Sequence, residues 1–224
     1  METYYSYDQT RNNSLTKVFG YMFFGLLVTA LSAYGLFYLL ISGAVSIGSY
    51  GGLTLIAAIG LFVLIFVSQY YCLKNKRGGF LTYVLYALCM GILLSSIMLS
   101  YSLQFLGFVF LCTGGSFGAM ALYGILTKRS TASLGMFGTG AIFGVLTLSL
   151  VNIFLRSEAV YYLISYIGLA AMLALTAYDI NRTKSLVNSG QMTEGLAIYM
   201  ALQLYTDFIY IFVRLVVIMS RNRR

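Results

Sequence analysis

The chain has 224 residues, of which 60% are hydrophobic and only 9% are charged, and its net charge is +8. A soluble domain carries about 25% charged residues, so this composition excludes an ordinary water-soluble domain and requires lipid around most of the surface. Histidine is absent, which excludes serine–histidine and cysteine–histidine nucleophile pairs and zinc sites with histidine ligands.

The basic residues lie in short clusters between apolar runs. This distribution is typical of residues that orient helices in a bilayer, and we do not expect a nucleic-acid partner. The three cysteines are Cys72, Cys89 and Cys112, and none of them forms a CxxC pair. We interpret them as small packing residues, and we expect no disulfide framework and no cofactor.

Residues 1–17 form a polar tail without the basic stretch, short apolar core and cleavage site of a signal peptide. Seven apolar runs follow, at 18–41, 53–73, 80–100, 104–127, 134–155, 159–180 and 195–219. A bilayer core of about 30 Å is crossed by about 20 helical residues. Backbone groups in lipid must be paired within the segment, so we predict an all-α membrane domain over 18–220 with seven transmembrane helices. A basic tail at 221–224 ends the chain.

Basic and non-basic connections alternate along the chain. The basic residues follow the second, fourth and sixth runs: Lys74, Lys76, Arg77, Lys128, Arg129, Arg182 and Lys184. The positive-inside rule therefore predicts a multi-pass inner-membrane protein with its N-terminus in the cytoplasm. The last run leaves two alternatives, because a full span puts the C-terminal tail outside whereas a re-entrant segment returns it to the cytoplasm.

Several glycines have the spacing of close helix–helix contacts. Gly114 with Gly118, and Gly140 with Gly144, are each four residues apart. Small residues at this spacing let two helix backbones approach closely, so we predict packing contacts at these glycines.

Two of the six acidic residues, Asp179 and Asp207, fall within apolar runs. An ionisable group at a helix centre in lipid costs roughly 2.5–3.5 kcal/mol, so a functional role is the default interpretation. Gln203, Asp207, Tyr210 and Arg214 follow one helical stripe, which should face a cavity or other helices. The structural alternatives are an Asp–Arg pair that joins helices and, for Asp179, an interfacial acid paired with Arg182.

Two carboxylates that meet in a low-dielectric site share a proton, because both cannot ionise cheaply. Their titration then belongs to the pair, and such a site responds to pH. In the ionised form it offers the hard oxygen ligands that Ca²⁺ prefers. Asp179 and Asp207 are therefore candidate ligands for protons and Ca²⁺, provided that the fold brings them together.

Six segments carry a family resemblance: VFGYMFFGLLVTA, GILLSSI, SFGAMALYGILTKR, VNIFLRSEA, LTAYDINRTK and LYTDFIYIFVRLV. In this order they resemble the bacterial branch of the transmembrane Bax inhibitor motif family, from about residue 14 onward. The resemblance implies that the other six helices surround a hydrophobic seventh helix. It also implies a pH-sensitive calcium leak whose paired aspartates correspond to Asp179 and Asp207.

The second span departs from the family pattern. In the family, an arginine at its cytoplasmic end latches to the aspartate pair, whereas here Lys74 lies nearest, followed by Lys76 and Arg77. Lysine lacks the bidentate fork of arginine, so we expect a weaker latch or one made differently. Arg182 and Arg214 are further candidate counter-charges.

Three other functions remain open at the level of sequence. The chain could regulate another membrane protein, such as a protease or a secretion complex, without transport. It could be an intramembrane aspartyl protease, but no recognition motif accompanies the two acids and we do not expect an enzyme. It could be a secondary transporter, although no repeat and no proline-broken helix supports this.

Overall fold

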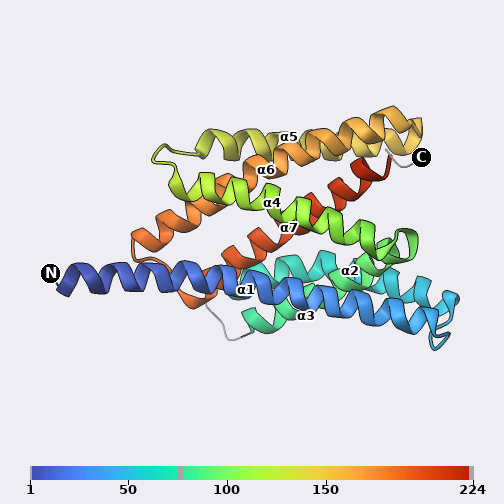
Figure 1. Cartoon of the computed structure of the whole chain (residues 1–224), viewed down its shortest axis with the longest axis horizontal. Coiled ribbons are helices and arrows are strands. Elements are labelled where there is room, and N and C mark those ends of the chain that lie inside the picture. The colour runs from blue at the N-terminus through green and yellow to red at the C-terminus, as the bar shows by residue number, and fades with distance from the viewer. Residues whose placement is uncertain (1, 75–77, 222–224) are drawn as a thin grey trace. The chain divides into compact units, whose positions relative to one another are not determined.

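The computed structural model describes residues 2–74 and 78–221, and within these ranges the chain forms seven α-helices and no strand (Figure 1). The helices are α1 (Glu2–Ile41), α2 (Ile47–Leu73), α3 (Gly79–Ser100), α4 (Leu103–Leu126), α5 (Ala132–Leu155), α6 (Glu158–Asn188) and α7 (Glu194–Arg221). All seven are long and apolar enough to cross a membrane. The predicted all-α, seven-span membrane fold is therefore confirmed.

Two helices run further than their apolar sequence predicts. Helix α1 begins at Glu2, so the polar residues 2–17 continue the first span as helix. Helix α6 continues eight residues beyond the predicted end at 180, because no glycine interrupts the polar residues that follow. It ends two residues before Gly190, whose φ of +70° suits a left-handed turn after a helix.

Helix α7 decides between the two alternatives for the last run. It is one uninterrupted helix of 28 residues, which is about 42 Å long and exceeds a hydrocarbon core of about 30 Å. A re-entrant segment needs a turn in its middle, and Glu194–Arg221 contains none. The last run therefore spans fully. The cytoplasmic N-terminus and the enclosure of α7 by the other six helices stay predictions.

The described chain divides into two compact units, and we describe each by itself. Unit 1 contains the chain up to Leu103 together with Val187–Tyr205. Within it, α1 and α2 both pack against α3. Gly91 of α3 lies so close to α1 that an added Cβ atom would be 2.6 Å from the Thr29 carbonyl oxygen and would also meet the Ser32 hydroxyl.

A buried hydroxyl cluster joins three helices of unit 1. The Thr29 Oγ1 atom lies 2.9 Å from the Gly25 carbonyl oxygen, 3.0 Å from the Ala87 carbonyl oxygen and 2.6 Å from the Tyr205 hydroxyl. Carbonyl oxygens only accept, so Thr29 donates its one proton to them and Tyr205 donates to Thr29. The first half of α7 is thereby bonded to α1, and Thr29 links both to α3.

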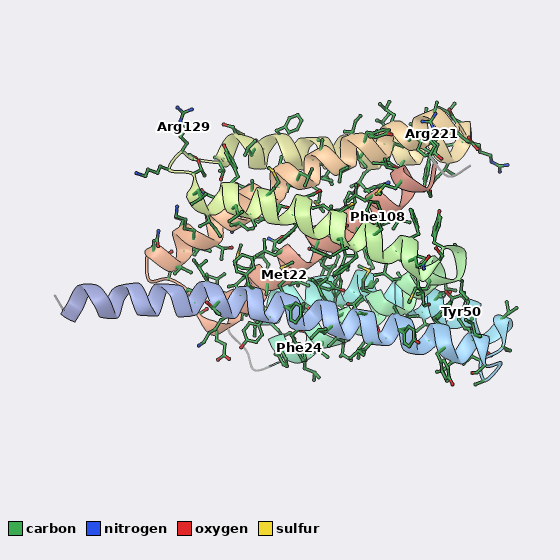
Figure 2. The ribbon with its side chains drawn as sticks, in the orientation of Figure 1. Met22, Phe24, Tyr50, Phe108, Arg129 and Arg221 are labelled. Carbon is green, nitrogen blue, oxygen red and sulfur yellow. The ribbon has the colours of Figure 1, made fainter. Side chains whose placement is uncertain are left out.

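Unit 2 contains Gln104–Leu186 together with the chain from Thr206 onward. Its α6 packs closely on two neighbours: Gly124 of α4 meets Ala177 and Ile180, while Gly135 and Gly138 of α5 meet Tyr178 and Leu175. Phe208 of α7 contacts the rings of Phe110 and Phe117 of α4. Arg129, between α4 and α5, and Arg221, at the end of α7, lie at opposite ends of this unit (Figure 2).

The glycine prediction is wrong. At Gly114, Gly118, Gly140 and Gly144, an added Cβ atom would meet no described atom outside the local chain within 4 Å. The four-residue spacing places two glycines on one face but does not determine where that face points. The close contacts of unit 2 occur instead at Gly124, Gly135, Gly138 and Gly168, where the partner helix has a bulky side chain or a carbonyl oxygen.

Candidate functional site

Asp207 lies at the middle of α7, 13 residues after Glu194 and 14 before Arg221. Its side chain is buried, and its Oδ2 atom has no hydrogen-bond partner among the described residues. The hydroxyl of the fully buried Thr176, on α6, lies within hydrogen-bonding reach of the carboxyl group. An unpaired buried carboxylate oxygen is costly, so this position requires an explanation beyond packing.

Asp179 lies on α6, one turn after Thr176, and is also buried. It is close enough to Asp207 for the two side chains to interact electrostatically. It also interacts electrostatically with Arg182, which lies one turn further and is exposed. Unit 2 therefore brings together the two aspartates that the sequence singled out, from spans that are consecutive in the chain.

Helix α6 positions Asp179 because its three faces have different neighbours in unit 2. The face toward α4 carries Ala177, Ile180, Asn181 and Lys184, and the face toward α5 carries Ala171, Leu175 and Tyr178. The third face carries Gly168, Thr176 and Asp179 and meets the second half of α7. Spacings of three and four residues keep each set on one side of a helix. Contacts on two faces fix the rotation of α6 and so direct Asp179 toward Asp207.

Two polar residues next to Asp179 bind the C-terminal end of α4. The Asn181 Nδ2 atom donates to the Gly124 carbonyl oxygen at 3.1 Å, and the Lys184 Nζ atom donates to the Ile125 and Thr127 carbonyl oxygens at 2.6 and 3.3 Å. The Thr131 hydroxyl donates to the Asn181 Oδ1 atom at 3.1 Å. The last carbonyls of a helix have no partner within it and carry partial negative charge, which an ammonium group stabilises.

We expect Lys184→Met to lower the free energy of unfolding by about 1.5–3 kcal/mol, because it leaves the Ile125 and Thr127 carbonyls at the end of α4 without a charged donor. The measurement is thermal unfolding of the purified protein in detergent. Lys184→Arg should recover most of the loss. Lys128→Met is the matched control, since Lys128 is exposed near the same helix end. Equal melting temperatures for Lys184→Met and the control would contradict the assigned bonds.

The candidate counter-charges lie in different surroundings. The Lys74 ammonium donates to the Tyr70 hydroxyl at 3.2 Å and stacks over the same ring, within unit 1. Arg77 lies outside the described residues. The Arg214 Nη2 atom donates to the Tyr210 hydroxyl at 2.9 Å. Arg182 is the basic residue with an electrostatic contact to Asp179, and the latch by Lys74 stays a prediction.

The donor atoms of this site are only part of a Ca²⁺ ligand set. Ca²⁺ takes six to eight oxygen ligands in proteins, at roughly 2.3–2.6 Å. No group of three or more acidic, cysteine or histidine side chains that could hold a metal occurs among the described residues. Asp179, Asp207 and the Thr176 hydroxyl supply part of such a set, and water would have to complete it.

The family model described as "Inhibitor of apoptosis-promoting Bax1" matches residues 11–224. The chain belongs to this family. It is 34% identical over 220 residues to the Escherichia coli K12 inner membrane protein YbhL, with 93% of this chain and 92% of that protein covered. It is 29% identical over 217 residues to an uncharacterised Borreliella burgdorferi protein, with 95% and 94% covered.

A third relative is an uncharacterised membrane protein of Streptococcus pyogenes serotype M3, 34% identical over 168 residues, with 74% of this chain and 73% of the relative covered. These matches agree with the multi-pass fold, and the resemblance noted in the sequence is confirmed. The E. coli relative is named for its location in the inner membrane.

Sequence reasoning missed Thr176, Asn181 and Gly168 as parts of the site, and it interpreted Lys184 only as a topology signal. The sequence did carry a signal for Asn181 and Lys184, because these two residues share one helical face with Ala177, next to Asp179. Thr176 gave no such signal, since a threonine within an apolar run is also typical of simple packing. Gly168 is defined only by its neighbours on α7, Tyr210 and Arg214.

Proposed function

We propose that this protein is a pH-sensitive calcium leak of the bacterial inner membrane, gated by Asp179 and Asp207. The observation that carries the proposal is the meeting of two buried carboxyl groups on facing spans, with one Asp207 oxygen lacking a hydrogen-bond partner among the described residues. An acidic side chain within the membrane has a high free-energy cost, so a functional role is its default interpretation.

The proposed mechanism follows from the charges of the pair. When ionised, the two carboxylates attract a divalent cation and the basic groups that hold the site closed. When protonated, they release both, because the attraction disappears with the charge. Cation residence and opening therefore respond to pH in opposite directions, and we expect maximal flux at mildly acidic pH. The pair titrates as one unit, so replacement of either acid changes the whole response.

The proposal includes no catalytic step and no cofactor. In this proposal the protein binds protons and Ca²⁺ and is surrounded by lipid. We also propose that the N-terminus is cytoplasmic, as the basic connections indicate. The membrane family and the inner-membrane location of the E. coli relative support this setting.

The test is Ca²⁺ flux into proteoliposomes that contain the purified protein, measured across a pH series. Wild type should show flux above empty liposomes with a mildly acidic maximum. Asp179→Asn and Asp207→Asn should each flatten the pH dependence, since asparagine keeps the shape of the side chain and does not titrate. Absence of flux at every pH, from protein shown to be folded, would exclude the leak and favour the regulator of another membrane protein.

A further inference from the structure

Arg214 is a charged residue within the apolar run of α7, on the same helical stripe as Asp207. It lies seven residues after Asp207 and seven before Arg221, which places its Cα atom about 10 Å along the axis from the helix midpoint. A hydrocarbon core extends about 15 Å on either side of its midplane. The Arg214 side chain is half-buried in the protein.

A tyrosine on the same stripe binds the Arg214 guanidinium. Long basic side chains near span ends usually extend outward so that the charge reaches water. Arg214 instead donates from Nη2 to the hydroxyl of Tyr210, one turn closer to Asp207, at 2.9 Å. Its guanidinium carbon also lies 4.8 Å from the centre of the Tyr210 ring. The two contacts hold the positive charge on the stripe that also carries Asp207.

Helix α6 provides room for this arrangement at one glycine. A Cβ atom at Gly168 would lie 2.6 Å from the Tyr210 hydroxyl and 3.4 Å from the Arg214 Nε atom. Gly168 is on the α6 face that carries Thr176 and Asp179. The arginine and tyrosine therefore occupy the same α6–α7 contact as the aspartates, on the side of Asp207 that leads to the C-terminal end of α7.

A fixed positive charge at this place discriminates between cations by valence. The repulsion energy of a cation is proportional to its charge, so Ca²⁺ is repelled twice as strongly as K⁺ at the same point. The Tyr210 hydroxyl and ring are neutral partners, which hold the guanidinium without neutralising it.

We propose that Arg214 is a specificity-determining residue that lowers the permeation of Ca²⁺ relative to K⁺ through this site. The inference rests on the proposed function, and it adds a charge filter between the aspartates and the far side of the membrane. The leak is then a weakly selective cation leak in which Arg214 limits the divalent component.

The experiment compares Ca²⁺ and K⁺ flux into the same proteoliposomes for wild type, Arg214→Gln and Arg214→Lys. At a separation of about 10 Å and an effective dielectric constant of about 20, loss of the charge should raise the Ca²⁺ to K⁺ flux ratio about tenfold. Arg214→Lys should stay within about twofold of wild type because the charge remains. Arg221→Gln is the matched control, since Arg221 stacks over Tyr162 of α6 at the end of the helix, and it should leave the ratio unchanged.

A second variant keeps Arg214 itself, in case Arg214→Gln does not fold. Tyr210→Phe removes the hydroxyl that holds the guanidinium at the α6–α7 contact, so the flux ratio should rise in the same direction by a smaller factor. An unchanged ratio in folded Arg214→Gln, or in folded Tyr210→Phe when Arg214→Gln cannot be purified, overturns the inference while the leak stands. Wild type without flux of either ion overturns the proposed function and this inference together.

Discussion

Gly91→Ala is expected to destabilise the protein by about 2–3 kcal/mol, because the added methyl group has no space between α3 and α1. It would meet the Ser32 hydroxyl, the Ser32 Cβ atom at 2.9 Å and the Thr29 carbonyl oxygen at 2.6 Å. The carbonyl is backbone and cannot rotate away, so the two helices must separate. Thermal unfolding in detergent should show a melting temperature lower by about 5–10 °C.

The matched control for this variant is Gly140→Ala. Gly140 is also within a helix, and no described atom outside the local chain lies within 4 Å of its added Cβ position. Alanine in a helix is more favourable than glycine by about 0.5–1 kcal/mol, so this variant should melt at or slightly above the wild-type temperature. Equal destabilisation of both variants would mean that the loss in Gly91→Ala does not come from the close α1–α3 contact.

A double variant tests the geometry of the same contact. The Ser32 hydroxyl donates to the Thr29 carbonyl oxygen at 3.1 Å and occupies part of the space at Gly91. Ser32→Ala combined with Gly91→Ala should recover part of the lost stability, because the clash with the Ser32 hydroxyl disappears while the Ser32 Cβ atom stays. The clash with the Thr29 carbonyl persists, so full recovery would contradict the arrangement.

Thr176→Val should move the pH response of the proposed leak upward by about one pH unit, which corresponds to about 1.4 kcal/mol. The Thr176 hydroxyl has one proton, and it donates to the Met172 carbonyl oxygen at 2.9 Å. While its proton is used in this bond, the Thr176 hydroxyl can only accept a hydrogen bond from a protonated Asp207. To bind an ionised Asp207, the hydroxyl must rotate and donate its proton to the carboxylate. Hydrogen bonds to charged acceptors are the stronger ones, so valine removes more from the ionised form.

The readout is the pH at which Ca²⁺ flux in proteoliposomes is half-maximal on the alkaline side. Thr176→Ser should restore the wild-type value, because serine returns the hydroxyl. Thr113→Val is the control: Thr113 is buried in α4 and donates to the Val109 carbonyl oxygen at 2.8 Å in the same manner. A shift of the same size in the Thr113 variant would show that loss of any buried hydroxyl has this effect.

The sequence by itself determined the membrane class, the seven spans and the two acidic residues of interest. Hydropathy is a property of a short stretch of chain, and lipid leaves the backbone of an apolar stretch no alternative to a helix. Asp179 and Asp207 were recognisable for a related reason, since a carboxyl group within an apolar run is costly wherever the run packs. Neither inference requires knowledge of which helices are neighbours.

The tertiary structure decided which residues meet. The spacing at Gly114 and Gly140 suggested close contacts, but the contacts occur at Gly124 and Gly168. The Thr176 hydroxyl lies within hydrogen-bonding reach of Asp207, and Arg214 donates to the Tyr210 hydroxyl. The rotation and register of a helix depend on side chains from several distant segments at once. For that reason the local pattern placed the charges in the membrane, and only the packing of α6 against α4, α5 and α7 arranged them into a site.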